Sequence, residues 1–167
     1  MTTDTDILSV KNLCVEFATR GGVARVLDGV DLTLKQGETL GIVGESGCGK
    51  SMTALSIMRL IPTPPGRTVD GQIKFRGEDL RTASLARMQA LRGNRISMIF
   101  QEPMTSLNPV FTVGDQIAET TRLHDAMPAR AARDRAVEML RSVRIPAPEQ
   151  RARASIRINF QAVCANA

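Results

Sequence analysis

One short stretch constrains the fold of this chain more than any other feature. Residues Gly44 to Ser51 read Gly-Glu-Ser-Gly-Cys-Gly-Lys-Ser and match the pattern G-x-x-x-x-G-K-[ST] at every fixed position. A short apolar run, Thr39 to Val43, precedes the pattern, and apolar residues at helical spacing continue from Lys50 to Ile61. The sequence therefore predicts a phosphate-binding loop between a buried strand and a helix.

Each residue type in this loop suits a site that holds a nucleotide's phosphates. Glycines let the backbone approach the phosphates, and successive backbone N–H groups point inward around the anion. The N-terminus of the following helix adds partial positive charge. Lys50 is predicted to reach the β- and γ-phosphates, and Ser51 to ligate Mg²⁺. The predicted nucleotide-binding loop residues are Gly44, Glu45, Ser46, Gly47, Cys48, Gly49, Lys50 and Ser51.

Other interpretations of the loop explain less of the sequence. A plain glycine-rich turn leaves the preceding apolar run and the following amphipathic helix as coincidences. A dinucleotide-binding turn needs G-x-G-x-x-G, which is not present here, and gives Lys50 and Ser51 no role. Cys48 is either a redox-sensitive thiol beside the phosphates or a tolerated small residue, and we favour the second.

The composition narrows the class of protein further. Of 167 residues, 43% are hydrophobic and 23% charged, so a packed core is expected. The net charge is +5, but only 3% of residues are aromatic, which argues against a base-stacking nucleic-acid platform. Three scattered cysteines predict no disulfide framework or metal knuckle, and hence a reducing compartment. We expect no signal peptide and no membrane-spanning segment.

Hydrophobic periodicity predicts the remaining elements. Pro62, Pro64, Pro65 and Gly66 should end the helix that follows the loop. We expect strands at Ile7 to Phe17 and late in Val23 to Leu34, where Val26, Val30, Leu32 and Leu34 fall on one face. Gly71 to Phe75 should form an edge strand, and Ile96 to Phe100 a second buried strand. Helices are expected at Ser84 to Leu91, Val113 to His124 and Ala129 to Val143. In the last helix, one apolar stripe is made by Ala132, Ala136, Met139, Leu140 and Val143, and Pro146 and Pro148 should end it.

A second loop leads to a family resemblance. The run Ile96 to Phe100 is followed by Gln101-Glu102-Pro103-Met104-Thr105-Ser106-Leu107-Asn108-Pro109. This loop and Gly41 to Ser51 together resemble the ATP-binding subunit of an ABC transporter, more narrowly of the bacterial oligopeptide, dipeptide, nickel and glutathione importers. The resemblance covers about Ile7 to Ala154. It implies an α/β fold, the N-terminal part of an ABC-type P-loop NTPase, with antiparallel strands, a partial parallel core sheet and the start of a helical subdomain.

The resemblance also implies roles for single residues. Gln101 matches the glutamine that in this family touches Mg²⁺ and the water near the γ-phosphate, so Ser51 and Gln101 are the expected metal ligands and Lys50 and Gln101 the expected catalytic residues. Phe17 lies where the family places an aromatic ring that stacks on adenine; the alternative is a plain core residue of a strand. The implied cofactors are ATP and Mg²⁺.

The same resemblance implies a domain plan and partners. Residues 1–110 would form the ATP-binding core, 111–150 a partial helical subdomain and 151–167 an aberrant tail. Membrane subunits would contact the loop from Gln101 to Pro109, and a second ATP-binding subunit would complete the site. The subunit would be cytoplasmic and peripheral at the inner face of the membrane, binding no nucleic acid.

Several of the family's later motifs do not occur in this sequence. It has no Leu-Ser-Gly-Gly-type signature, no strand ending in Asp-Glu after Gln101 and no switch histidine; His124 is expected to be a surface helix residue. Synonymous codons for Ile156 to Ala167, read one base earlier, spell Tyr-Pro-His-Gln-Phe-Ser-Gly-Gly-Met-Arg-Gln-Arg, which resembles the signature region. We hypothesise a frameshift near Gln150 to Ser155 and expect negligible ATP hydrolysis.

Two other functions stay open on the sequence alone. A stand-alone P-loop kinase or small NTPase would explain Gly44 to Ser51 but not the loop after Phe100. A basic nucleic-acid-binding module would explain the arginine-rich C-terminal third, although a solvated helix face with interspersed acids is the preferred account. The arginines concerned are Arg130, Arg133, Arg135, Arg141, Arg144, Arg151, Arg153 and Arg157.

Overall fold

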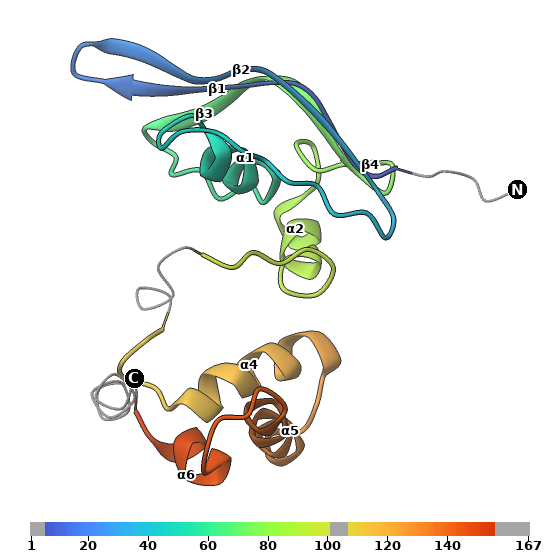
Figure 1. The fold of residues 1–167 in the computed structure, drawn as a ribbon, viewed down its shortest axis with the longest axis vertical. Helices are drawn as coiled ribbons and strands as arrows, with labels where there is room; N and C mark the ends of the chain where they lie inside the picture. The colour runs from blue at the N-terminus through green and yellow to red at the C-terminus, as the bar shows by residue number, and fades with distance from the viewer. Residues whose placement is uncertain (1–5, 101–106, 156–167) are drawn as a thin grey trace, which may run out of the picture. The chain divides into compact units, whose positions relative to one another are not determined.

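The computed structural model describes residues 6–100 and 107–155. Contacts divide the chain into two compact units, Met1–Arg92 and Gly93–Ala167. A sheet with the helices α1 and α2 makes up the described part of the first unit, and the helices α4, α5 and α6 belong to the second (Figure 1). The domain boundary predicted at residue 110 stays a prediction.

An antiparallel sheet organises the first unit. Its strands β1 (Asp6–Thr19), β2 (Gly22–Lys35), β3 (Gly66–Phe75) and β4 (Glu78–Asp79) lie in the order β2-β1-β3-β4. The predicted strands in β1 and β2 are confirmed, together with the turn at Gly21 between them. β3 starts earlier than predicted and lies between β1 and β4, so it is not an edge strand where β4 pairs with it.

A bulge in the hairpin changes which residues of β2 face the core. Val30, Leu32 and Leu34 are half-buried, in agreement with the predicted parity. Val26 was expected on the same face, yet it is exposed and Leu27 is buried instead, with only 3% of its surface accessible. The pairing of β1 with β2 shifts register in this region, and Gly29 adopts a φ of +66° that favours glycine.

An ion-pair network joins three strands at one level of the sheet. Glu16 on β1 bonds Arg25 on β2 and Arg67 on β3, each at 3.1 Å. Hydrogen bonds from Arg25 and, second in strength, from Arg67 lower the pKa of the Glu16 carboxyl. These ion pairs connect β1 to both neighbouring strands at Glu16, the residue immediately before Phe17.

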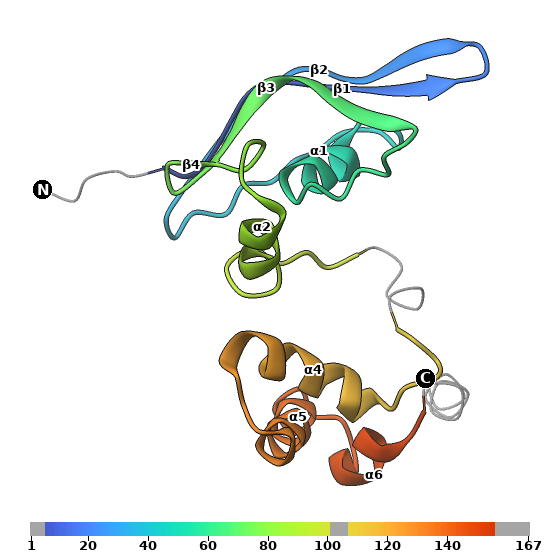
Figure 2. The same ribbon diagram turned by 180° about the vertical axis from the view of Figure 1, so that it is seen from behind.

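The sheet curves over α1, as both views of the ribbon show (Figures 1 and 2). α1 spans Lys50–Ile57 and ends earlier than the predicted Ile61. Arg92 caps this end, because its Nε donates to Met58 O and its Nη2 to Arg59 O, each at 2.8 Å. Burial lowers the pKa of the Arg92 guanidinium. α2 (Leu85–Leu91) begins as predicted, with the Ser84 side chain accepting from Arg87 N.

Two predicted buried strands do not form. Thr39 to Val43 and Ile96 to Phe100 are outside the described strands and are largely exposed, with Val43 96% and Ile99 95% accessible. Apolar runs of this kind form strands when neighbours pair with both edges and helices cover both faces. Among the described residues no strand pairs with either run, so the partial parallel core sheet is absent there.

Three helices make up the described part of the second unit. They are α4 (Val113–Asp125), α5 (Ala129–Ser142) and α6 (Pro148–Arg153). Ala118 of α4 packs with Ala132 and Ala136 of α5, since small side chains allow close approach. The predicted stripe on α5 is right for its alanines and Leu140, whereas Met139 and Val143 are exposed.

α6 was not predicted as a helix. Pro148, expected only to stop α5, occupies the first turn of α6, where its missing N–H costs nothing. α6 also overlaps the region expected to be an aberrant tail, since it continues to Arg153. Within the described residues, no helix has the length and apolar character needed to cross a membrane.

Candidate functional site

The loop from Gly44 to Ser51 is held against the hairpin through a glycine. Gly49 is buried, and a Cβ built on it would lie 2.6 Å from Leu27 Cδ2 and 3.4 Å from Val26 O. Its φ of +94° and the φ of +86° at Gly47 lie in the left-handed region. Only glycine meets both demands at position 49 without strain, so β2 fixes where the loop turns into α1.

Lys50 folds its side chain back over the loop. The ammonium Nζ donates to Gly44 O at 2.7 Å and to Glu45 O at 2.6 Å, and lies 3.3 Å from Cys48 Sγ. None of these partners is a carboxylate, so no acidic side chain offsets the positive charge of Lys50 within the loop. An anion that entered the loop would find a cation already directed into it.

The N-terminus of α1 offers further donors to an anion. No side chain caps it, and its first turn contains no acidic residue. The N–H groups of Lys50, Ser51 and Met52 belong to the first turn, where an α-helix supplies no internal acceptors. Ser51 is exposed there, which leaves its hydroxyl accessible to a ligand. Uncapped N–H groups and the helix dipole together favour phosphate at this position.

The other predicted loop residues have distinct surroundings. A Cβ on Gly44 would lie 2.6 Å from Cys48 Sγ, so a side chain at position 44 would displace the thiol of Cys48. Cys48 N donates to Glu45 O at 3.3 Å, which closes that turn. Cys48 is a free, exposed thiol, whereas Cys14 is buried. Glu45 and Ser46 are exposed.

Phe17 lies on β1 opposite Gly66 of β3. Its ring is half-buried, and a Cβ on Gly66 would lie 2.7 Å from Phe17 Cζ and 2.5 Å from Ile61 Cγ2. The ring is therefore packed at the end of the helix-to-strand connection and still partly accessible. Whether it stacks on a base stays a prediction. Sequence reasoning missed Leu27, Ile61 and Gly66, although the glycine after Pro64-Pro65 was a usable signal.

Gln101 lies outside the described residues, so its metal and catalytic roles stay predictions. Among the described residues, no group of three His, Cys, Asp or Glu side chains could hold a metal ion. Mg²⁺ commonly combines few protein ligands with phosphate oxygens and water. The exposed Ser51 hydroxyl beside an anion-favouring helix terminus fits such a nucleotide-borne ion.

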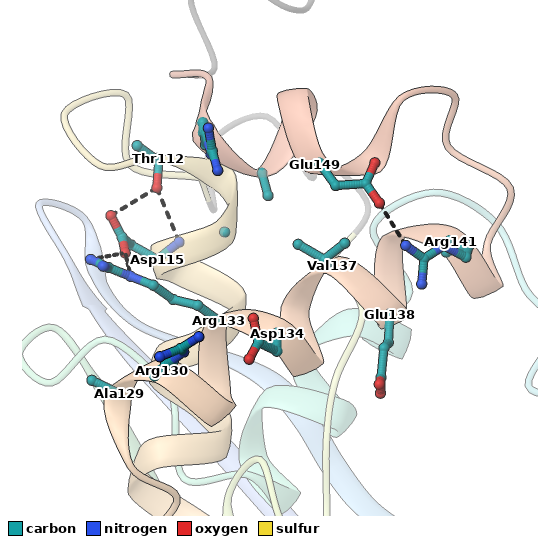
Figure 3. A pocket seen from close by; sticks show the side chains of 13 residues that line it. Thr112, Asp115, Ala129, Arg130, Arg133, Asp134, Val137, Glu138, Arg141 and Glu149 are labelled. Atoms are coloured by element: carbon teal, nitrogen blue, oxygen red, sulfur yellow. Dashed lines mark hydrogen bonds and ion pairs between the residues drawn. The ribbon is translucent and has the colours of Figure 1, made fainter.

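A hollow of about 1000 Å³ lies in the second unit, between α4, α5 and α6 (Figure 3). Asp115 accepts from Thr112 Oγ1 at 2.8 Å and pairs with Arg133 at 3.0 Å, and Arg141 pairs with Glu149 at 2.6 Å. None of the predicted nucleotide-binding residues lines this hollow. Two ion pairs at the hollow instead join the helices: Asp115 with Arg133 links α4 to α5, and Arg141 with Glu149 links α5 to α6.

Removing the carboxylate of Asp115 should reduce the acid sensitivity of these helices. Two hydrogen bonds lower the pKa of Asp115 below 3.8, the one from Thr112 more strongly than the one from Arg133. The stability that it contributes is present above the unfolded-state pKa and is lost as the pH falls below 3.8. In urea unfolding followed by circular dichroism, Asp115→Asn should shrink the loss of stability between neutral pH and about pH 3 by about 0.5 kcal/mol.

Asp134→Asn is the matched control, since it removes the same charge from the same hollow. If the unchanged chain and Asp115→Asn lose equal stability in acid, the role assigned to the bonds of Asp115 with Thr112 and Arg133 is wrong.

Three arginines of the arginine-rich third form ion pairs within the second unit. Arg133, Arg135 and Arg141 each contact an acid, respectively Asp115, Glu138 and Glu149. This arrangement agrees with a solvated helix face and weakens the case for a phosphate-binding surface. His124 was expected to be a surface residue, but it is half-buried: a Cβ on Gly93 would lie 2.9 Å from its Nε2.

Comparison with known proteins places these features in a family. Residues 27–158 match the family described as ABC transporter. The chain is 52% identical over 145 residues to "Probable peptide ABC transporter ATP-binding protein y4tR" of Sinorhizobium fredii, covering 87% of this chain and 43% of that protein. It is 52% identical over 147 residues to the oligopeptide transport ATP-binding protein OppD of Bacillus subtilis, covering 88% and 41%. The chain thus spans less than half the length of these curated relatives.

Solved structures support the fold. The dimeric, ADP- and phosphate-bound ATP-binding cassette MJ0796 matches with a TM-score of 0.75 at 22% identity, over 90% of this chain and 62% of that one. A second structure of MJ0796, described as a bacterial ABC transporter cassette, matches with a TM-score of 0.74 at 22% identity, over 89% and 61%. At this identity the likeness concerns the fold alone.

Proposed function

Because the chain belongs to the ABC transporter family, matched over residues 27–158, we propose that it is part of an ATP-binding subunit that energises an importer of peptides or related small solutes. The observation that carries the proposal is the loop from Gly44 to Ser51. A lysine ammonium directed into the loop, two glycines in left-handed conformations and an uncapped helix N-terminus converge on one short segment. Such a constellation suits a nucleotide's phosphates.

The proposed residue roles follow from this chemistry. Lys50 would leave the carbonyls of Gly44 and Glu45 and donate to the β- and γ-phosphates. The first-turn N–H groups of α1 would hold phosphate oxygens, and Ser51 would ligate Mg²⁺ beside them. Phe17 would stack on the base, and Gln101 would contact the ion and the attacking water.

Substrate, partners and location are proposed from the relatives. The two relatives described above are named as peptide and oligopeptide transport proteins, which favours peptides over nickel or glutathione. Membrane subunits would contact the loop from Gln101 to Pro109, a second ATP-binding subunit would face the site, and the complex would sit at the inner face of the membrane. We expect this chain to bind ATP with negligible hydrolysis; turnover that depends on Lys50 would contradict that expectation.

Replacing the Ser51 hydroxyl should uncouple ATP binding from Mg²⁺. In calorimetric titrations, Mg²⁺ should strengthen ATP binding to the unchanged chain. Ser51→Ala should lose about 1.5 kcal/mol, or tenfold, of affinity with Mg²⁺ present, and little without it. The substitution removes the proposed Mg²⁺ ligand but retains Lys50 and the helix N–H groups that would hold the phosphates.

Ser46→Ala is the matched control for the metal role, because it removes an exposed hydroxyl from the same loop and keeps the backbone N–H with which Ser46 would contact a phosphate. If ATP fails to bind the unchanged chain in either condition, the proposed function is wrong. If Ser51→Ala and Ser46→Ala bind ATP equally well with Mg²⁺, the metal role of Ser51 is wrong.

A further inference from the structure

The connection between α1 and β3 closes tightly around the edge of the Phe17 ring. A Cβ on Gly66 would lie 2.7 Å from Cζ and 2.9 Å from Cε1 of the ring, and 2.5 Å from Ile61 Cγ2. Real Cβ atoms do not approach other atoms so closely, so this ring edge rests on a position that only glycine can occupy without displacing it. Gly66 is itself buried.

Hydrogen bonds fix the backbone on which the ring rests. Gly66 N donates to Pro62 O at 2.8 Å, and Thr63 Oγ1 donates to Gly66 O at 2.9 Å. A further bond, from Ala18 N to Pro65 O at 3.1 Å, joins this connection to β1 beside Phe17. The backbone under the ring is therefore held from both its own turn and the neighbouring strand.

The same helix links this connection to the phosphate-binding loop. α1 begins at Lys50, inside the loop, and ends at Ile57, shortly before Ile61. We propose that Gly66 is a positioning residue that sets where the Phe17 ring meets the base of a bound nucleotide, an inference that rests on the proposed function. The loop would hold the phosphates at one end of α1, and Gly66 would hold the ring at the other.

Alanine at position 66 is a suitable probe of this role. The φ of Gly66 lies outside the left-handed region, so alanine can adopt the same backbone conformation. The atoms that its methyl would meet belong to the side chains of Phe17 and Ile61, which can move. Gly66→Ala should therefore displace the ring and leave the strand in place.

The test compares a ligand that has a base with one that lacks it. The full chain is titrated with Mg²⁺-ATP and with Mg²⁺-tripolyphosphate. Because stacking on an aromatic ring contributes about tenfold in affinity, Gly66→Ala and Phe17→Leu should each weaken ATP binding about tenfold. The double variant should lose no more than either single variant, and tripolyphosphate binding should not change in any of them.

Gly21→Ala is the control, since Gly21 has no atom within 4 Å of an added Cβ and no left-handed φ; it should bind both ligands as the unchanged chain does. The inference is overturned if Gly66→Ala keeps full ATP affinity or weakens the binding of tripolyphosphate as much as that of ATP. It is also overturned if the losses of ATP affinity caused by Gly66→Ala and Phe17→Leu add in the double variant. Lys50-dependent ATP binding that Phe17→Leu does not weaken would also overturn it, with the proposed function intact. Failure of the unchanged chain to bind either ligand would overturn both.

Discussion

Lys50→Ala should weaken ATP binding about a hundredfold and leave the fold intact. Two charge-assisted hydrogen bonds from the ammonium to phosphate oxygens, at about 1.5 kcal/mol each, account for a loss of about 3 kcal/mol. In the structure without nucleotide, the same ammonium bonds the carbonyls of Gly44 and Glu45 and the sulfur of Cys48. Those carbonyls belong to an exposed loop and water can replace the lysine, so the stability of the chain should change by no more than about 0.5 kcal/mol.

Fluorescent-ATP titration measures the loss, with Lys74→Ala as the matched control. Lys74 is an exposed lysine on β3, so its removal changes the net charge equally and does not touch the loop. If Lys50→Ala and Lys74→Ala bind ATP equally, the assignment of the phosphate-binding loop is wrong. A large fall in stability of Lys50→Ala would instead show that its contacts with the loop carbonyls support the fold.

The sequence predicted elements whose signals are local. α4 begins after Thr112 and α2 after Ser84, each with a side-chain oxygen that accepts from the first turn, and apolar spacing marks the buried face of each helix. The β1–β2 hairpin likewise follows from alternation around a glycine turn. Thr39 to Val43 has an equally clear pattern but forms no strand, because strand formation depends on partners that the pattern does not contain.

The contacts that place the candidate site were beyond sequence reasoning for a different reason. Leu27 against Gly49 and Phe17 against Gly66 are pairs that lie far apart in the chain. Periodicity shows that such residues are apolar or small, but not which residue each one meets. The bulge at Gly29 adds to the difficulty, since it exchanges Leu27 for Val26 on the buried face of β2.

Gly49→Ala should destabilise the first unit more than alanine at any other glycine of the loop. A left-handed conformation costs an L-residue about 1–2 kcal/mol, and overpacking against Leu27 about 1–3 kcal/mol more. We expect a combined loss of about 3 kcal/mol, together with weaker ATP binding, because Gly49 immediately precedes the first turn of α1. Amide hydrogen exchange in β1 and β3 measures this loss separately from the helices of the second unit.

Alanine at three glycines separates the cost of the left-handed conformation from the cost of overpacking against Leu27. Gly47 has a left-handed φ but nothing within 4 Å of an added Cβ, and Gly21 has neither feature. Gly47→Ala should therefore lose about 1–2 kcal/mol and Gly21→Ala essentially nothing. Adding Leu27→Ala to Gly49→Ala should cost about 1–2 kcal/mol less than the sum of the single losses, since the shorter side chain removes the overlap. Strict additivity, or equal losses for Gly47→Ala and Gly49→Ala, would mean that the close approach of Leu27 does not position the loop.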